Sequence, residues 1–493
     1  MQINVSNISV EYDGTPVIYQ ADFVIHENEK IALIGRNGCG KTTLLKVLTG
    51  EVEYQKGEDD APYGIFTSGN PVIGFLKQTS NDDKAKTMFD EILDAYSSLI
   101  KIEKDMESAL EDLQKDSCDQ NVRRYSRLCE QFEREGGYTY KKEYLTAVKK
   151  FGFSNEDMQK PLCEFSGGQR TKISLLKLLL SKPDVLLLDE PLGALDLKMR
   201  KEMQLELKAI HRNVGITFVY VTHDQEEALT MSDKIVVVND GVIQQIGTPK
   251  KIYDEPSNAF VADFIGESNI LSGLMVKDFK VCFLDTLFDC EDKGFAKNEP
   301  VDLVIRPEDI TIYRDGVSGQ LGGKVVSSVF KGTWYEMEIE CNGYEFTVQS
   351  TVEAKPGDEV RLGVTPDGIH IMKKLRTVNT FKGEVEDEST VRFCGGSFEV
   401  GTHGLQKGDT VNVSVPFDAV ELTDDEEDGV IGANVTQILY KGTYYQVQIY
   451  TDTDEDFYID TTDEWDIDDR VGVKVLADKI KVEKTEETED EEV

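Results

Sequence analysis

Residues 35–42 read GRNGCGKT, and the spacing of this stretch decides the fold. The apolar run 30–34 precedes it and a helical pattern over 42–48 follows it, which is the setting of a phosphate-binding loop. The three glycines let backbone N–H groups turn toward a phosphate, and the positive end of the following helix adds to the attraction. The stretch therefore predicts an α/β fold that binds ATP.

Two side chains of this loop have distinct predicted roles. Lys41 is placed to bridge the β- and γ-phosphates, and the Thr42 hydroxyl is placed to bind Mg²⁺. Cys39 is interpreted as a small residue that the loop tolerates, not as a redox group. ATP and Mg²⁺ are thus the predicted cofactors. The predicted ATP-binding residues of the loop are Gly35, Asn37, Gly38, Cys39, Gly40, Lys41, Thr42 and Thr43.

Two adjacent acids follow a second apolar run, 185–188, which is typical of a strand buried on both faces of a parallel sheet. Neighbouring residues of a strand point to opposite faces, so Asp189 and Glu190 cannot have the same role. We predict that Asp189 holds Mg²⁺ through water. Glu190 is the predicted general base, which orients and deprotonates the water that attacks the γ-phosphate.

Two further motifs suit the same chemistry. His223 follows the apolar run 216–221 and is predicted to reach the γ-phosphate from the carboxyl end of that strand. The sequence SGGQ at 166–169 opens another helix and presents N–H groups and a hydroxyl to an anion. One nucleotide does not need two phosphate-binding helix ends, so this segment is not a second loop for the same ATP.

The order GRNGCGKT, SGGQ, LLLDEP (186–191) and THD (222–224) resembles that of ABC ATPases. The resemblance implies a head-to-tail dimer in which the SGGQ of one subunit closes over the ATP held by the other. The residues implied to act in trans are Ser166, Gly167, Gly168 and Gln169.

The same resemblance gives roles to three residues outside these motifs. Tyr12 is implied to stack under adenine, although an ordinary strand aromatic remains an alternative. Gln78 is implied to sense Mg²⁺ and the attacking water, as a catalytic residue and metal ligand, although an exposed loop residue remains an alternative. Asp196 is implied to lie in the loop that crosses the dimer interface.

The two halves of the predicted ATPase domain have sequences that resemble different families. Residues 186–272 resemble the ATP-binding subunits of bacterial spermidine/putrescine importers. The sequence at 35–51, 72–80 and 136–184 is similar to the cytosolic ABC-F proteins, which act on ribosomes. The chain is therefore interpreted as a hybrid joined near LLLDEP, of natural or artificial origin, and an ABC-F-like ATPase on the ribosome remains the alternative function.

The C-terminal third contains an internal repeat. KGTWYEMEI at 331–339 returns as KGTYYQVQI at 441–449, and VDLVIRPEDI at 301–310 returns as VNVSVPFDAV at 411–420. The alternation of apolar and polar residues predicts a tandem pair of small β-barrels. The Arg-Pro-Glu text at 306–308 resembles the TOBE barrel of importer ATPases. The second copy lacks this text, so packing or dimerisation are its alternative roles.

The predicted fold class is α/β: a P-loop ABC ATPase domain with a helical subdomain, followed by tandem small β-barrel (TOBE-like) modules. The predicted domains are the ATPase domain at 1–240, with its helical subdomain at about 80–180, a connecting segment at 241–272, β-modules at 273–374 and 375–484, and an acidic disordered tail at 485–493.

The composition of the chain excludes some classes of binding partner. The chain of 493 residues has 54 Lys and Arg against 93 Asp and Glu, a net charge of −39. This excess argues against nucleic acid as the main partner. No apolar stretch approaches the ~20 residues that span a bilayer. Anionic membrane surfaces should repel so acidic a chain, so attachment to a membrane would run through a protein partner. The eight cysteines lack CxxC spacing and indicate neither a zinc site nor a disulfide framework.

These observations predict the ATP-hydrolysing subunit of an ABC importer of polyamine type. The expected partners are a second copy of the chain, two integral-membrane permease subunits and, indirectly, an extracytoplasmic solute-binding protein. The expected location is the cytoplasmic face of the cell membrane. A scaffold without activity is disfavoured because every hydrolytic residue is present. Which solute is carried, and whether the helical insert couples to a permease, stay open.

Overall fold

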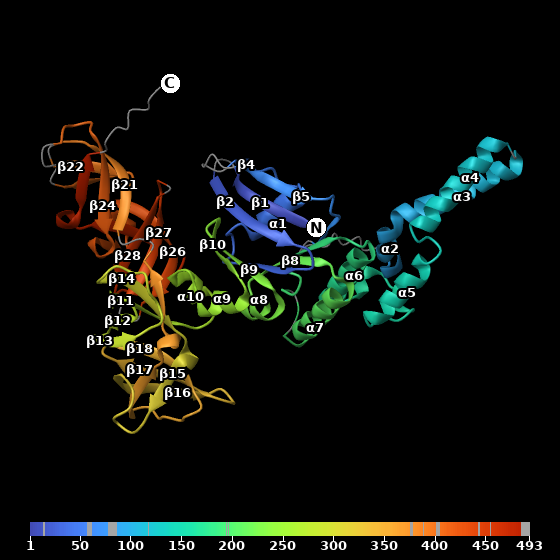
Figure 1. Cartoon of the computed structure of the whole chain (residues 1–493). Helices are drawn as coiled ribbons and strands as arrows, with labels where there is room; N and C mark the ends of the chain where they lie inside the picture. The colour runs from blue at the N-terminus through green and yellow to red at the C-terminus, as the bar shows by residue number, and fades with distance from the viewer. Residues whose placement is uncertain are drawn as a thin grey trace. The chain divides into compact units, whose positions relative to one another are not determined.

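The chain forms two compact units, Met1–Ile252 and Tyr253–Val493 (Figure 1). The predicted tail and two predicted site residues, Gln78 and Asp196, lie outside the described residues. The computed structural model describes residues 1–12, 15–56, 62–76, 86–116, 118–193, 195, 197–374, 378–387, 389–400, 405–441, 444–453 and 455–484.

The first unit contains a largely parallel sheet with the strand order β10-β9-β3-β8-β7-β6. Every residue of β7 and β8 is buried, as the apolar runs predicted. Strands β6, β7, β8, β3 and β9 run parallel, and β10 is antiparallel to β9. The strands are β3 (Lys30–Ile34), β6 (Ile73–Leu76), β7 (Val185–Asp189), β8 (Thr217–Thr222), β9 (Lys234–Asn239) and β10 (Val242–Gly247).

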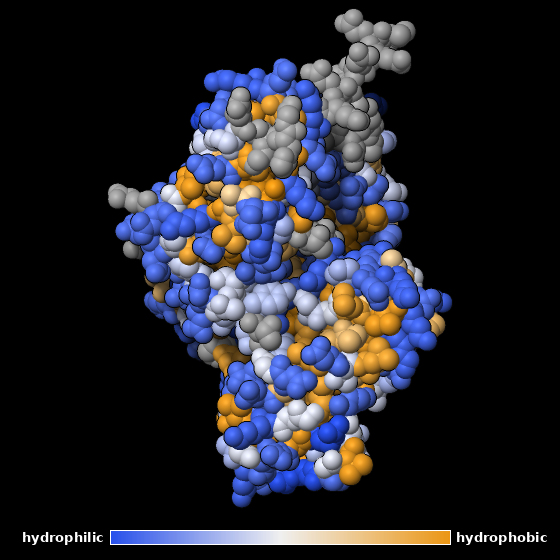
Figure 2. Space-filling model, turned by 90° about the vertical axis from the view of Figure 1, so that its left-hand side faces the viewer, coloured by the Kyte–Doolittle hydropathy of each residue, from blue (hydrophilic) through white to orange (hydrophobic). Residues whose placement is uncertain are grey.

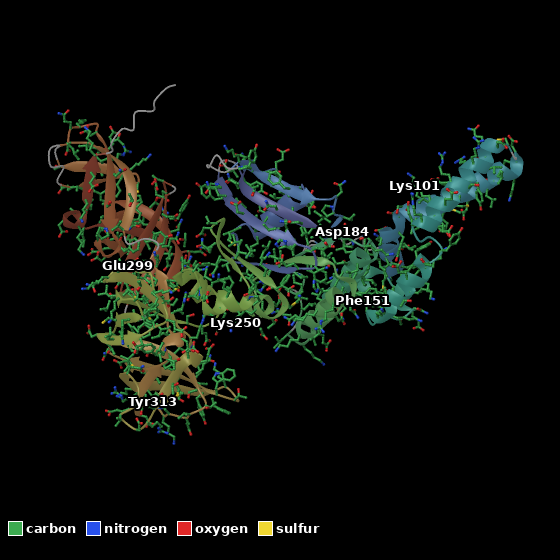
Figure 3. All side chains as sticks on the ribbon, in the orientation of Figure 1. Lys101, Phe151, Asp184, Lys250, Glu299 and Tyr313 are labelled. Carbon is green, nitrogen blue, oxygen red and sulfur yellow. The ribbon has the colours of Figure 1, made fainter. Side chains whose placement is uncertain are left out.

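This strand order sets the position of the site. The carboxyl ends of parallel strands meet at one edge of a sheet, so the residues that follow β3, β8 and β7 lie along that edge. At the opposite ends Asp184, labelled in Figure 3, fixes the spacing of three strands. Its carboxylate accepts a hydrogen bond from Val72 N (2.8 Å), and its carbonyl accepts one from Thr217 N (3.2 Å).

An antiparallel sheet packs against the phosphate-binding loop. Its strands are β1 (Gln2–Tyr12), β2 (Thr15–His26), β4 (Gln55–Lys56) and β5 (Gly64–Ser68). Buried residues of β1 and β2 share one core with β3, β7, β8 and α1 (Lys41–Leu48). Ile18 and Leu44 are examples, each with at most 1% of its surface exposed. The loop is therefore held between two sheets.

A helical part lies between β6 and β7. α3 and α4 pack as a hairpin that extends away from α6 and the sheet (Figure 1). Tyr96, Tyr140, Tyr144 and Leu176 belong to a separate hydrophobic core at the base of the hairpin. The helices of the unit beyond α1 are α2 (Met88–Leu93), α3 (Ser97–Lys115), α4 (Asp119–Arg134), α5 (Tyr140–Lys150), α6 (Gly167–Leu180), α7 (Leu197–Val214) and α8 (Gln225–Met231).

The second unit begins with two short helices, α9 (Pro249–Asp254), which starts at the end of the first unit, and α10 (Ala259–Phe264), and continues into β-strands. The first module consists of the sheets β13-β12-β11-β14-β20 and β15-β19-β16-β17-β18. Both sheets contribute to one hydrophobic core. Its strands are β11 (Asn269–Lys277), β12 (Lys280–Phe283), β13 (Thr286–Asp289), β14 (Glu299–Ile305), β15 (Ile310–Tyr313), β16 (Leu321–Phe330), β17 (Tyr335–Cys341), β18 (Tyr344–Ser350), β19 (Glu359–Val364) and β20 (His370–Lys373).

The second module repeats this architecture. Its sheets β23-β22-β21-β24-β30 and β25-β29-β26-β27-β28 have the same relative strand order and a core of their own. The predicted tandem pair of β-modules is therefore confirmed. Its strands are β21 (Val378–Val385), β22 (Thr390–Phe393), β23 (Gly396–Glu399), β24 (Thr410–Pro416), β25 (Val420–Thr423), β26 (Ile431–Tyr440), β27 (Tyr445–Thr451), β28 (Asp456–Thr461), β29 (Arg470–Val475) and β30 (Lys481–Lys484).

A buried asparagine joins the two sheets in each module. The Asn269 side chain exchanges two hydrogen bonds with the backbone of Thr347, both at 2.8 Å. Asn379 does the same with Tyr458, at 2.8 and 2.7 Å. Burying an unpaired amide is costly. In both modules the backbone N–H and C=O of one residue satisfy the buried Asn side chain.

The second copy of the repeated KGT sequence, at 441–449, also contacts the first module. Lys441 has a fully buried side chain, and its Nζ lies 2.7 Å from Asp302 Oδ2 of the first module. Burial lowers the pKa of Lys441, and the charge of Asp302 opposes that effect. Tyr444 Oη lies 3.0 Å from Ser272 Oγ beside this pair. The contact favours packing as the role of the second module.

Arg306, the first residue of the Arg-Pro-Glu text, secures the segment that leads into the first module. It is 5% exposed. Its guanidinium donates to the carbonyls of Tyr253 (2.8 Å) and Ala262 (3.1 Å). Tyr253 in turn donates to Glu308 at 2.6 Å. This text therefore has a local structural purpose in the first module.

The predicted domain bounds stay predictions, but one of them separates two paired strands and another falls inside a strand. The bound at 240 separates β9 from its partner β10. The bound at 272 divides β11, which begins at Asn269.

Among the described residues, no helix is both long enough and apolar enough to cross a bilayer. On the face drawn in Figure 2, hydrophobic residues emerge in separate patches between hydrophilic ones.

Candidate active site

The phosphate-binding loop connects β3 to α1. Gly40 caps the helix at φ 94°. A Cβ on Gly40 would lie 2.4 Å from the Ile18 side chain and 2.7 Å from the Val17 carbonyl. Gly38 has φ 86°, in the left-handed region that favours glycine. Gly38 is therefore favoured by backbone conformation, and Gly40 both by conformation and by the close approach of β2.

Lys41 lies folded against its own loop. Its side chain is buried, and Nζ donates to the carbonyls of Gly35 (2.8 Å) and Arg36 (2.6 Å). Cys39 Sγ lies 3.9 Å from the same nitrogen, and burial raises the pKa of its thiol, which Lys41 partly offsets. A phosphate would offer Lys41 a charged acceptor, which forms a stronger hydrogen bond than a carbonyl does.

Thr42 and Asp189 meet across the sheet edge. Thr42 Oγ1 donates to Asp189 Oδ1 at 3.0 Å. Asp189 is 6% exposed; burial raises the pKa of its carboxyl, and the hydrogen bond from Thr42 opposes that effect. A hydroxyl beside a carboxylate is a pair of hard oxygen donors, which suits Mg²⁺.

Glu190 occupies an unusual backbone position next to Asp189. Its φ of 45° places a non-glycine residue in the left-handed region, a strained conformation that costs about 1–3 kcal/mol. Its N–H donates to the Val221 carbonyl at 3.2 Å, which ties the turn after β7 to β8. The carboxylate lies 3.6 Å from His223 Nδ1. The structure thus brings these two predicted catalytic residues together.

Three residues that the sequence reasoning did not identify hold the turn that carries His223. Asp224 caps α8, accepting from Glu227 N at 3.2 Å, and pairs with Arg200 of α7 at 3.0 Å. Glu227 is buried and accepts from Thr222 Oγ1 at 2.7 Å. An acid three residues after a capping Asp is a recognisable helix-start signal, so the cap was detectable in the sequence.

The SGGQ segment begins α6. Ser166 Oγ accepts from Gln169 N (3.3 Å), and Ser166 N donates to Gln169 Oε1 (3.0 Å), a reciprocal cap. Ser166, Gly167 and Gln169 are exposed. Gly168 is buried, and a Cβ there would lie 2.5 Å from Leu195 and 2.6 Å from Met199. The start of α6 is thus capped by its own side chains, and three of the four SGGQ residues are exposed.

The remaining predicted residues are less constrained. Tyr12 ends β1 and is 46% exposed, close along the strand ladder to the pair Val10 and Ile18 that flanks the loop. Asn37 is exposed at the loop, and Thr43 is half-buried on α1. Gln78 and Asp196 cannot be placed, because both lie outside the described residues.

Comparison with known proteins shows the family of this chain. The sequence model for the ABC transporter family matches residues 18–193, and the model for the TOBE domain matches residues 303–372. The spermidine/putrescine import ATP-binding protein PotA of Bacteroides thetaiotaomicron is 42% identical over 481 residues, which cover 97% of each chain. The chain belongs to the family of ABC transporter ATP-binding import proteins.

Other relatives in this family differ in extent. PotA of Desulfitobacterium hafniense is 43% identical over 379 residues, which cover 76% of this chain and 98% of that protein. Among solved structures, an ATP-binding subunit of an ABC transporter aligns with a TM-score of 0.39 at 19% identity, covering 51% of this chain and 92% of that one.

The hybrid interpretation is corrected by these comparisons. A junction near 186 with an ABC-F-like half before it is not supported, because similarity to import ATP-binding proteins runs over 97% of the chain. An ABC-F-like function on the ribosome loses its basis for the same reason. The stretch that suggested it contains the phosphate loop and SGGQ, whose residues are dictated by ATP binding and therefore separate ABC families poorly.

Proposed function

We propose that this ABC transporter ATP-binding protein hydrolyses ATP to drive the import of a polyamine, spermidine or putrescine. The observation that carries the proposal is the 42% identity over 97% of both chains to a spermidine/putrescine import ATP-binding protein. The presence of the phosphate loop, both acids and His223 along one sheet edge supports it, because an import protein of this family needs a complete hydrolytic set.

The nucleotide-binding part of the proposal uses the loop. Backbone N–H groups and Lys41 hold the phosphates, and Tyr12 stacks under adenine. Thr42 and Asp189, hydrogen-bonded to each other at 3.0 Å, hold Mg²⁺ together with Gln78. When bound, the metal offsets phosphate charge. The hydroxyl-carboxylate pair supports this assignment because its oxygens are of the type that Mg²⁺ prefers.

The hydrolytic part assigns Glu190 as the general base for the attacking water. His223 Nδ1 lies 3.6 Å from the Glu190 carboxylate. From there we assign His223 to contact the γ-phosphate that the water attacks. The left-handed backbone of Glu190 supports the assignment, since it turns the side chain out of the alternation that Asp189 follows. Arg200, Asp224 and Glu227 keep the His223 turn in place.

The proposed active form is a dimer. Ser166–Gln169 of one subunit acts on the ATP bound by the other, with Asp196 in the loop between them. The start of α6 supports this arrangement, because it is capped by Ser166 and Gln169 and three of its four SGGQ residues are exposed to solvent.

Import also requires a path through the membrane. We assign that path to two integral-membrane permease subunits, supplied with solute by an extracytoplasmic binding protein. The protein itself would lie at the cytoplasmic face of the membrane, attached through the permeases. The first β-module would act as the regulatory barrel, and the second would brace it through the Asp302–Lys441 pair.

Co-purification tests the partner assignment. A tagged Glu190→Gln chain, solubilised from its own cells in mild detergent with ATP, should retain two membrane-spanning subunits, because bound ATP keeps the dimer in one state. A tagged Lys41→Ala chain is the matched control for nucleotide dependence. Recovery of the chain without any membrane protein, under detergent conditions that preserve a known importer, would contradict the proposed assembly.

A further inference from the structure

The segment that leads into α2 is joined to the segment that leads into SGGQ. Leu162 N donates to the Lys86 carbonyl at 2.9 Å, and Met88 N donates to the Lys160 carbonyl at 3.0 Å. Thr87 and Pro161 form the bridge between these bonds. The chain at 160–162 is followed directly by a short 3-10 turn, Leu162–Glu164, and then by Ser166. A shift of α2 would therefore be passed to the start of α6 through backbone hydrogen bonds.

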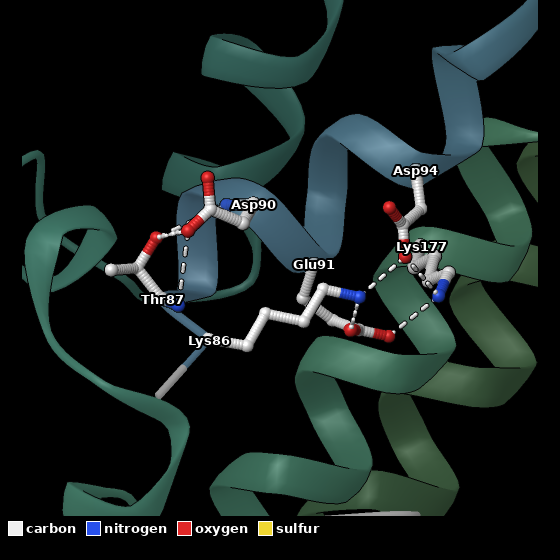
Figure 4. A network of polar contacts seen from close by, with 6 residues as sticks. All are labelled: Lys86, Thr87, Asp90, Glu91, Asp94 and Lys177. Carbon is white, nitrogen blue, oxygen red and sulfur yellow. Dashed lines mark hydrogen bonds and ion pairs between the residues drawn. The ribbon is translucent and has the colours of Figure 1, made fainter. Parts of the chain in front are cut away.

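Four charged side chains make a second connection between the same helices (Figure 4). Glu91 lies between two lysines, 2.6 Å from Lys86 and 2.6 Å from Lys177. Asp94 lies between the same lysines, at 2.5 and 3.0 Å. Lys177 belongs to α6, and the other three residues belong to α2 or flank it. We name this set, Lys86, Glu91, Asp94 and Lys177, the α2–α6 ion network.

The arrangement favours joint action over separate surface pairs. Each carboxylate contacts both lysines, so removal of one lysine leaves two acids close together with half their compensation. Burial raises the pKa of Glu91, but hydrogen bonds from Lys177 and Lys86 outweigh that effect and lower it. Glu91 is 17% exposed and Lys177 30% exposed. Isolated exposed pairs contribute little to stability, whereas networks in one geometry can fix orientation.

The network is well placed to orient the trans-acting terminus of α6. Lys177 lies eleven residues after Ser166, about three turns along one helix. A helix held both near its start, by the 86–88 and 160–162 pairing, and three turns later, by Lys177, has little freedom to tilt. The direction in which Ser166–Gln169 faces is then set by α2.

Building on the proposed ATP sandwich, we propose that the α2–α6 ion network positions SGGQ for the ATP of the partner subunit. Its members are positioning residues: they touch neither nucleotide nor water in the site and act through the orientation of α6. Disturbing them impairs the composite site from the SGGQ side and leaves the phosphate loop of the same chain intact.

The first test separates turnover from nucleotide binding. Lys177→Met should lower kcat by roughly 2- to 30-fold, the range in which coupling through such networks acts, with the affinity of the isolated chain for a fluorescent ATP analogue unchanged. Lys177→Arg, which keeps the charge, should restore kcat. Lys182→Met is the matched control, because Lys182 follows the same helix but pairs with Glu143 of α5. If Lys177→Met folds poorly, Glu91→Gln should give the same pattern.

Mixed dimers then identify the side of the site that is impaired. Lys177→Met mixed with Lys41→Ala should recover activity, since one site combines an intact loop with an intact SGGQ. Lys177→Met mixed with Gly168→Asp should stay low, since both defects lie on the SGGQ side. Wild-type kcat for Lys177→Met, or the reverse mixing pattern, would overturn the inference. Failure of the Lys41→Ala and Gly168→Asp mixture to recover would instead contradict the sandwich on which the proposed function relies.

Discussion

Replacing Glu190 by Gln should slow ATP turnover by about 10²–10⁴-fold, the usual contribution of a positioned general base. Gln keeps the size of the side chain but cannot accept a proton from water. ATP binding should persist, because Lys41, Thr42 and the loop N–H groups are unchanged. The variant should therefore accumulate with ATP trapped between two subunits.

Single-turnover kinetics with labelled ATP, alongside size-exclusion chromatography, would measure both effects. Glu226→Gln is the matched control, since Glu226 is an exposed acid of α8 close in sequence to His223. Its turnover should equal that of the unaltered chain. Near-normal hydrolysis by Glu190→Gln would remove Glu190 from the role of base and leave its left-handed backbone without a functional explanation.

Mixing two inactive variants should restore ATP hydrolysis. Lys41→Ala removes the phosphate-binding lysine. Gly168→Asp adds a side chain where a Cβ already approaches Leu195 and Met199 within 2.6 Å, and it places a negative charge beside the anion site. Each homodimer then lacks both working sites, but the mixed dimer has one intact loop facing one intact SGGQ.

Activity of the mixture, at different ratios of two differently tagged chains, is the measurement. It should pass through a maximum near equal amounts and vanish with either chain alone. Helical content of Gly168→Asp by circular dichroism serves as the folding control. Tag exchange shows whether mixed dimers have formed. If they have formed and the mixture is still inactive, SGGQ does not act in trans.

Much of the candidate site could be predicted because its motifs are local in sequence. The loop, the adjacent acids and His223 each follow an apolar strand, and parallel strands bring such residues to one edge. The left-handed conformation of Glu190 could not be predicted from the sequence, because it accompanies a hydrogen bond from Glu190 N to the Val221 carbonyl on the neighbouring strand.

The internal repeat was predictable from spacing, whereas the pairs that use it were not. Lys441 reads as a polar turn residue next to glycine, yet Asp302, far away in sequence, makes its burial tolerable. The α2–α6 ion network joins residues 86 to 94 with Lys177 in the same way. Such long-range charge pairs leave no periodic signal. The junction inferred near 186 was wrong for a related reason: short motif strings shared among ATPases gave too little information to separate families.

Uptake of radiolabelled spermidine and putrescine by the cells that carry this gene tests the central claim most directly. Energy-dependent uptake should be present with the unaltered gene, lost when its chromosomal copy carries Glu190→Gln, and kept with Glu226→Gln. Equal uptake of both polyamines in the Glu190→Gln and unaltered strains, with other polyamine importers deleted, would contradict the assignment of this protein to polyamine import.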